Sequence, residues 1–176
     1  MTENIFRKEL LETARCLGCH IVDIPDELKR VLPILPPEWR RRLSRMIAQK
    51  PYDLAFVHEG NYYPCELKLE KLGFSFNLNK IEPHQIRALQ SAKESGAYPF
   101  ILINFRKTLT TPQQVRYNIK ERLHNVVYCV TIDKLKSWIK QGKKSMTLAM
   151  LEENCLKLNW DKSSQTWELE KIFKYE

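Results

Sequence analysis

The chain has 176 residues, of which 43% are hydrophobic and 10% aromatic, enough for one domain with an ordinary core. Its 29 Lys and Arg residues outnumber its 21 Asp and Glu residues, and the net charge of +8 favours polyanions as partners. No apolar run approaches the roughly 20 residues of a membrane-spanning helix, and the polar first residues are unlike a secretory signal. We therefore expect a soluble, intracellular protein rather than a membrane or secreted one.

The cysteines are an odd number scattered through apolar segments, which argues against a secreted disulfide framework. Cys16-x-x-Cys19 followed by His20 could suggest zinc, but no second Cys or His pair follows at a finger-like spacing. We expect five reduced, structural cysteines: Cys16, Cys19, Cys65, Cys129 and Cys155.

Apolar residues at helical spacing predict an amphipathic helix from Ile5 to Leu17, followed by a short strand from Cys19 to Val22. Pro36-Pro37 favours a helix start, and we expect a short helix from about Pro37 to Ala48. Clustered guanidinium groups on this helix could neutralise DNA phosphates, although a solvated basic helix has the same pattern. The cluster comprises Arg40, Arg41, Arg42 and Arg45, beside Trp39.

The strongest local pattern is a pair of strand-like runs, Tyr52–Glu59 and Tyr62–Leu69, separated by Gly60-Asn61. This pattern predicts a hairpin with a two-residue turn. The polar segment of residues 70–80 predicts a mobile loop. A helix is then expected to begin at Pro83 and to end at Gly96.

The C-terminal half predicts two buried strands, a helix and a terminal hairpin. Strands joined through helices favour an α/β fold with a central mixed sheet flanked by helices. We expect a single domain over residues 1–176, with its core at about residues 5–130 and the terminal helix and hairpin at about residues 131–176. The predicted elements are strands at Tyr98–Phe105 and Val126–Val130, a helix at Asp133–Gln141, and a hairpin of Cys155–Trp160 with Thr166–Phe173.

Glu66 and Lys68 are two residues apart on the second hairpin strand, so both side chains leave the same face. With Gly60-Asn61 as the turn, Asp53 pairs with Lys68 and lies diagonally next to Glu66 on that face. Two neighbouring carboxylates repel unless a cation lies between them, and such hard oxygen ligands suit Mg²⁺ or Mn²⁺. A three-residue turn would send Asp53 to the opposite face. The alternative is an ordinary exposed ion pair on an edge strand.

Pro51-Tyr52-Asp53 and Glu66-Leu67-Lys68 resemble the PD-(D/E)XK nuclease signature, with one residue inserted in its first element. The segments Asn79 to Ile86 and Gly96 to Ile103 resemble the RecU-type and archaeal Hjc-type Holliday junction resolvases. Arg7-Lys8-Glu9-Leu10-Leu11 resembles the resolvase start, where a helix-borne Glu joins the active site. The resemblance covers about residues 5 to 105.

The resemblance implies a restriction-endonuclease-like fold and a Mg²⁺-dependent endonuclease, with Mn²⁺ as a possible substitute. It implies a cytoplasmic homodimer, prokaryotic or phage-encoded, that acts on four-way DNA junctions. The alternatives are another PD-(D/E)XK nuclease of the repair or restriction type, and a non-catalytic nucleic-acid-binding module. An RNA-binding accessory protein would also suit the charge and the aromatic content. The catalytic residues that the resemblance implies are Glu9, Asp53, Glu66, Lys68 and Gln85.

Within this set, Asp53, Glu66 and the carbonyl of Leu67 would hold the metal, and Glu9 would complete its shell, with Glu12 one turn later as the alternative. The remaining two side chains, the lysine of the signature and the early glutamine of the following helix, would act at the attacking water or at a phosphate oxygen. The expected DNA-binding residues are Arg40, Arg41, Arg42, Arg45, Lys71 and Lys80.

Overall fold

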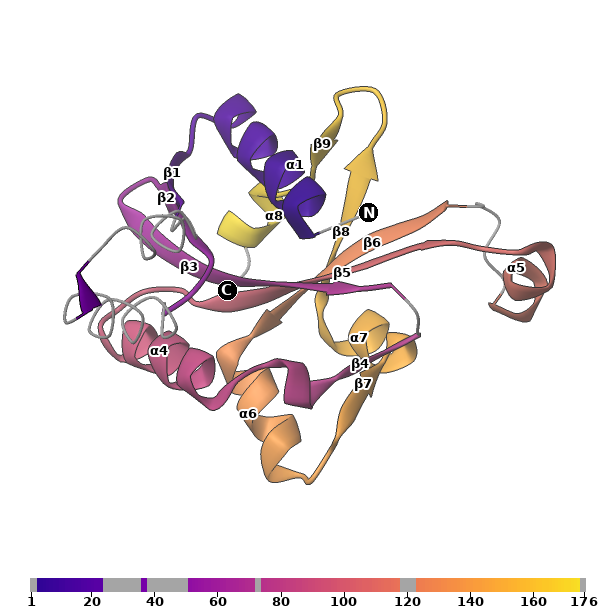
Figure 1. Cartoon of the computed structure of the whole chain (residues 1–176). Helices are drawn as coiled ribbons and strands as arrows, with labels where there is room; N and C mark the ends of the chain where they lie inside the picture. The colour runs from indigo at the N-terminus through magenta and orange to yellow at the C-terminus, as the bar shows by residue number, and fades with distance from the viewer. Residues whose placement is uncertain (1–2, 24–35, 38–50, 72–73, 118–122, 175–176) are drawn as a thin grey trace.

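The computed structural model describes residues 3–23, 36–37, 51–71, 74–117 and 123–174. Within them, a seven-stranded sheet has the order β1-β2-β3-β5-β6-β8-β9 (Figure 1). Strands β3 and β5 run parallel, and the other neighbouring strands run antiparallel. The expected class, a mixed sheet flanked by helices, is confirmed. The strands are β1 (His20–Asp23), β2 (Leu54–His58), β3 (Asn61–Glu70), β5 (Phe100–Thr108), β6 (Leu123–Thr131), β8 (Leu156–Asp161) and β9 (Thr166–Trp167).

Helices lie on both faces of this sheet, as Figure 1 shows. One face carries α1 (Glu3–Cys16) and α8 (Glu170–Phe173). The opposite face carries α4 (Pro83–Glu94), α6 (Ile132–Lys140), α7 (Leu148–Asn154) and a small sheet of β4 (Ser75–Asn77) with β7 (Ser145–Thr147). A 3-10 helix, η2 (Leu78–Lys80), leads into α4, and α5 (Thr111–Tyr117) lies at the end of the long β5–β6 arm.

The central strands are buried on both faces, which explains their continuous apolar sequence. Along β5, Ile101 and Ile103 pack in the cluster under α4 and α6, whereas Phe100 and Leu102 pack in the cluster under α1. The same alternation along β3 sends Leu67 toward α1. Its even-numbered neighbours therefore point toward α4.

The hairpin turn lies one residue earlier than expected, at Glu59-Gly60, because His58 pairs with Asn61. Both turn residues have positive φ, 49° and 78°, which is the geometry of a type I′ turn. Moving the turn by one residue shifts the strand partners by two, so every side chain keeps its face. The predicted face of the hairpin residues is therefore right, although the predicted partners are wrong.

Several other expectations need correction. Residues 75–80 are not a loop but β4 and η2, and Thr166–Phe173 is a two-residue strand followed by α8 rather than one strand. These short elements carry too few residues to establish a periodicity. The expected helix at Pro37–Ala48 lies outside the described residues, except for its first residue. None of the helices in the described ranges is long and apolar enough to cross a membrane.

The five cysteines are free. Cys65 and Cys129 are fully enclosed, and burial raises the pKa of both thiols. Cys19 is also buried, and its Sγ lies 3.6 Å from Nδ1 of His58 on β2. Among the described residues, no three His, Cys, Asp or Glu side chains gather closely enough to hold a metal, at the Cys16-x-x-Cys19 segment or elsewhere.

Candidate active site

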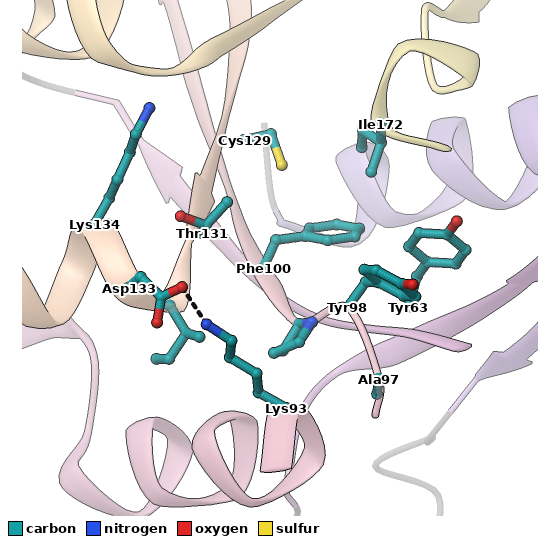
Figure 2. A pocket seen from close by; sticks show the side chains of 12 residues that line it. Tyr63, Lys93, Ala97, Tyr98, Phe100, Cys129, Thr131, Asp133, Lys134 and Ile172 are labelled. Carbon is teal, nitrogen blue, oxygen red and sulfur yellow. Dashed lines mark hydrogen bonds and ion pairs between the residues drawn. The ribbon is translucent and has the colours of Figure 1, made fainter. Parts of the chain in front are cut away.

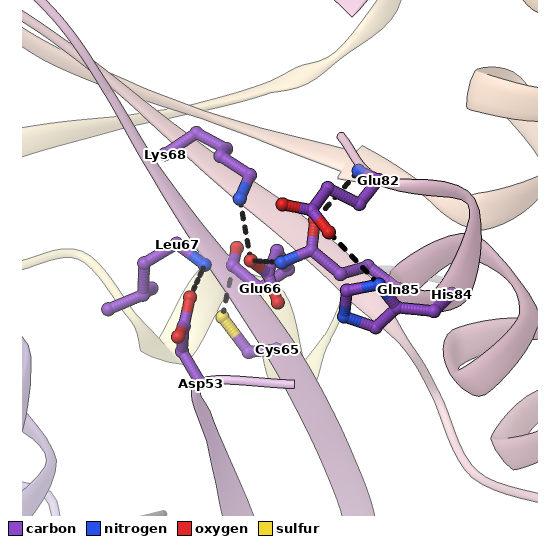
Figure 3. A network of polar contacts seen from close by, with 8 residues as sticks. All are labelled: Asp53, Cys65, Glu66, Leu67, Lys68, Glu82, His84 and Gln85. Atoms are coloured by element: carbon purple, nitrogen blue, oxygen red, sulfur yellow. Dashed lines mark hydrogen bonds and ion pairs between the residues drawn. The ribbon is translucent and has the colours of Figure 1, made fainter. Parts of the chain in front are cut away.

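The centre of the candidate site is Glu66, a carboxylate buried in the middle of the sheet with 1% of its surface exposed. Strand β3 pairs only with β5 at these residues, because its pairing with β2 ends at Cys65. The Lys68 and Glu66 side chains are only 16% and 2% exposed, so they do not form the exposed ion pair that the alternative interpretation required. Lys68 Nζ donates to Glu66 Oε1 at 2.7 Å, and Gln85 Nε2 donates to the same oxygen (Figure 3). The other oxygen, Oε2, is buried without a hydrogen-bond partner. Both donors thus serve one oxygen and leave the second unsatisfied.

The environment of Glu66 disfavours its charged form. Burial and the neighbouring charge of Asp53 raise the pKa of Glu66 from 4.5 to about 8, and the Lys68 ammonium only partly opposes that rise. A buried carboxylate with a free oxygen is costly unless positive charge reaches it. Of the two donors that reach Glu66, Lys68 is the one that carries a positive charge.

Asp53 precedes β2 and is held at its backbone and at its side chain. Its N–H donates to the Cys65 carbonyl at 3.1 Å, and its Oδ2 accepts from the Leu67 N–H at 2.9 Å (Figure 3). Continuing the β2–β3 register places Asp53 opposite Glu66 rather than diagonally next to it. Its carboxylate is 5% exposed and raises the pKa of Glu66. The two acids therefore lie side by side.

This donor set fits a divalent cation. Two adjacent carboxylates are hard oxygen ligands, and the unpartnered Glu66 Oε2 is one that a cation would satisfy. The N–H and C=O of one strand residue point to the same side, so the Leu67 carbonyl faces the side of Asp53, ahead of the start of β2. The described residues supply only two carboxylates here, so backbone oxygen and water would have to complete a metal shell.

Gln85 is 9% exposed and oriented by the start of α4. Its Oε1 accepts from the Glu82 N–H at 2.9 Å, and Glu82 in turn caps the first turn of the helix. This reciprocal capping box fixes the amide so that its NH₂ group faces Glu66. The spacing Glu82-x-x-Gln85 was a signal for the box in the sequence. His84 Nδ1 lies 3.1 Å from Glu82 Oε2 and does not contact Glu66.

The structure does not bring Glu9 to the carboxylate pair, contrary to the expectation from the resemblance. Its two oxygens accept from Arg106 on β5, at 2.7 and 3.2 Å. This bidentate pair satisfies the Glu9 charge on the α1 face of the sheet. Glu12, the alternative, is exposed. From α1 the side chain that reaches the site is Arg7, whose Nη2 donates to the Asp53 carbonyl at 3.1 Å. No local spacing could reveal contacts separated by 46 and 97 residues.

The expected DNA-binding residues fall into two groups. Lys71 is exposed directly after β3. Lys80 is half-exposed and ion-paired with Glu70, and its Nζ lies 5.8 Å from the centre of the Phe76 ring. The arginine cluster, Arg40, Arg41, Arg42 and Arg45, lies outside the described residues.

Comparison with known proteins identifies the family. Residues 48–170, more than half of the chain, match the family model RecU, recombination protein U. No curated protein sequence matches the chain. One similar solved structure is the Holliday junction resolvase Hjc from Archaeoglobus fulgidus, at 10% sequence identity and a TM-score of 0.43, covering 88% of this chain and 89% of that one. The matched range contains the acid pair, Lys68 and Gln85, and the chain therefore belongs to the RecU family of Holliday junction resolvases.

Proposed function

We propose that this protein is a metal-dependent DNA endonuclease that resolves four-way junctions by hydrolysing one phosphodiester in each of two strands. The observation that carries the proposal is the pair Asp53 and Glu66, with a buried, unpartnered oxygen on Glu66. A fixed pair of buried acids with one unpartnered oxygen is suited to bind a divalent metal. Membership of a nuclease family supports the same activity.

In this proposal Asp53, Glu66 and the carbonyl of Leu67 hold Mg²⁺ or, as a substitute, Mn²⁺. When bound, such a metal would supply Lewis acidity at the scissile phosphate and would make a neighbouring water easier to deprotonate. A water oxygen would then bond to phosphorus and lose a proton to solvent while one P–O ester bond breaks, and the departing oxygen would take up a proton from solvent. Lys68 offsets negative charge as it grows on the phosphoryl oxygens. Gln85, already directed at Glu66, orients the attacking water.

Resolution of a four-way junction needs two cuts, and one chain supplies one acid pair with one lysine. We therefore include a symmetric homodimer in the proposal, because a closed twofold assembly matches the twofold symmetry of a junction. Positive charge for the DNA backbone would come from Lys71, and from the arginines at positions 40, 41, 42 and 45. This contact should be independent of base sequence. Replacing Arg41 and Arg42 by alanine should weaken binding to all sequences alike and flatten the salt dependence.

The direct test compares a labelled four-way junction with a linear duplex of the same arm sequences, in Mg²⁺, in Mn²⁺ and in a chelator. We expect paired, symmetric nicks in the junction only when the metal is present. Sedimentation of the free protein should show a dimer. If the protein cuts the duplex as fast as the junction in the presence of metal, it is a general PD-(D/E)XK nuclease and not a resolvase. Binding without any cutting would leave a non-catalytic nucleic-acid-binding protein.

A further inference from the structure

Two cavities, each lined by two tyrosines, lie beside Ala97 in the segment between α4 and β5. Tyr62 and Tyr63 leave opposite faces of β3, so the two pairs of tyrosines lie on either side of this strand. The larger cavity, of about 600 Å³, is lined by Tyr63 and Tyr98 (Figure 2). The smaller, of about 430 Å³, is lined by Tyr52 and Tyr62. Ala97 lines both cavities, so they are neighbours. We name Tyr52, Tyr62, Tyr63 and Tyr98 the tyrosine track.

The outer end of the track is a stacked pair of rings. Tyr63 is 5% exposed and fixed in the core, with its ring 5.0 Å from that of Phe173. Tyr98 stacks on Tyr63 at 5.4 Å and 27°, yet it remains 54% exposed. The buried ring therefore holds an exposed one in place. A pre-ordered aromatic surface loses little side-chain freedom when another flat ring stacks on it.

The inner end of the track begins beside the acids. Tyr52 directly precedes Asp53, and its hydroxyl lies 2.7 Å from that of Tyr62. Tyr62 and Glu66 are four residues apart on the same face of β3, which corresponds to about 13 Å at 3.3 Å per residue. A strand with its phosphate at the acids would therefore reach Tyr62 within a few nucleotides.

The charges around the larger cavity suit a nucleotide. Its floor is apolar at Phe100, and Lys93 forms an ion pair with Asp133 beside it (Figure 2). Lys134, which donates to the Asn154 carbonyl, also lines the cavity. Two lysines against one acid give the lining a net positive charge. Aromatic surface next to positive charge is the combination that binds single-stranded nucleic acid.

We propose that the tyrosine track binds unpaired nucleotides of the DNA strand that is cut, with a base stacked on Tyr98. Bases inside a paired duplex stack on their neighbours and offer no free face to a protein ring, whereas unpaired bases at a branch point do. The preferred substrates are therefore branched DNAs with unpaired nucleotides near the scissile phosphate. This inference rests on the proposed function, because it concerns the strand in the same active site.

The test measures binding of a fluorescent oligothymidine by the full chain, using fluorescence anisotropy. Tyr98→Ala should weaken binding by about 5- to 100-fold, the range for loss of one base–aromatic stack, whereas Tyr98→Phe should bind like the parent. Ile139→Ala, a truncation of an exposed apolar residue on α6 (43% exposed), is the matched control and should also bind like the parent. An oligonucleotide carrying 5-iododeoxyuridine should crosslink to Tyr98, as located by mass spectrometry.

Equal binding by the parent and Tyr98→Ala would overturn the inference, and so would crosslinks that map away from the track. Circular dichroism of each variant identifies a loss caused by misfolding, and in that case the crosslink to the parent chain decides. Cutting of a fully paired junction in Mg²⁺ is measured in parallel. A parent that binds and crosslinks oligothymidine but cuts no junction would contradict the proposed function alone. A parent that cuts junctions but shows no effect of Tyr98→Ala would contradict the track alone.

Discussion

Two glutamates on opposite faces of one sheet, Glu9 half-buried and Glu66 buried, differ in the donors that bind their carboxylates. Glu9, on the α1 face, has both oxygens bound by the single guanidinium of Arg106. Glu66, on the α4 face, has two donors on one oxygen and none on the other. The first carboxylate is a completed structural ion pair. The second lies beside another acid, and no donor among the described residues reaches its Oε2.

The largest expected effect is on cleavage. Glu66→Gln removes a metal ligand with almost no change in shape, so the rate of junction cutting should fall by about 10²- to 10³-fold or more, while junction binding persists. Asp53→Asn and Lys68→Ala should act in the same direction. Glu9→Gln is the matched control, since it makes the same change at a carboxylate bound to Arg106, and it should cut near the parental rate. Single-turnover cleavage with saturating enzyme provides the measurement. If Glu9→Gln cuts the junction slowly although its stability is unchanged, Glu9 takes part in catalysis.

The sequence could predict those parts of the contrast that rest on contacts between residues close together in the chain. The hairpin, its buried face and the proximity of Asp53 to Glu66 follow from two-residue periodicity, which survives a turn misplaced by one residue. The position of Gln85 in the first turn of a helix follows from Pro83, whereas its role in the site was implied by the resemblance alone. The Glu9–Arg106 pair joins residues 97 apart in sequence, and no local pattern constrains such a pair. For the same reason β4 and β7, three-residue strands that pair across 70 residues of chain, were not predictable.

The second expected effect is on stability in metal-free buffer. The folded-state pKa of Glu66 is about 8 against an ordinary 4.5, so the native state holds its proton more tightly than the unfolded state. The free energy of unfolding should therefore decline as pH rises from about 4.5 to about 8, by at most about 1.4 kcal/mol per pH unit. Urea unfolding at several pH values should show this decline in the parent and its loss in Glu66→Gln. A pH-independent difference between the two proteins would contradict the raised pKa.

Saturating Mg²⁺ should change the stability of the parent more than that of Glu66→Gln. A cation that binds the folded state stabilises it by mass action, and it favours the ionised form of Glu66. The decline above pH 4.5 should therefore become smaller when Mg²⁺ is present. Glu66→Gln should gain less from Mg²⁺ than the parent, and Glu9→Gln should gain as much as the parent.

The third effect concerns the completed pair on the α1 face. Arg106→Met leaves the Glu9 carboxylate largely buried without its partner, which should lower the free energy of unfolding by about 2–3 kcal/mol. The double variant Glu9→Gln with Arg106→Met should recover part of this loss, because it removes the uncompensated charge. Urea unfolding of the two single variants and the double variant measures the coupling between the residues. Independent, additive losses would mean that the two side chains do not stabilise one another.

The smallest effect is expected at Asp161, an exposed acid. Hydroxyl and backbone N–H groups, and not a cation, stabilise the charge of its carboxylate. Asp161 lies at the β8–β9 turn and accepts from Ser163 and Ser164, and these hydrogen bonds lower the pKa of its carboxyl from 3.8 to about 2. A depressed folded-state pKa contributes stability above pH 3.8, and that contribution is lost as pH falls toward 2. The sign is opposite to that of Glu66, because the folded state here favours the charged form.

Asp161→Asn should thus have a slightly lower melting temperature than the parent at neutral pH, and the difference should shrink as the solution is acidified below pH 3.8. Because β5 and β6 separate β8 and β9 from the strand that carries Glu66, junction cutting should be unaffected. A difference in melting temperature that stays constant down to the lowest pH at which both proteins fold would show that Asp161 acts through shape and not through its charge.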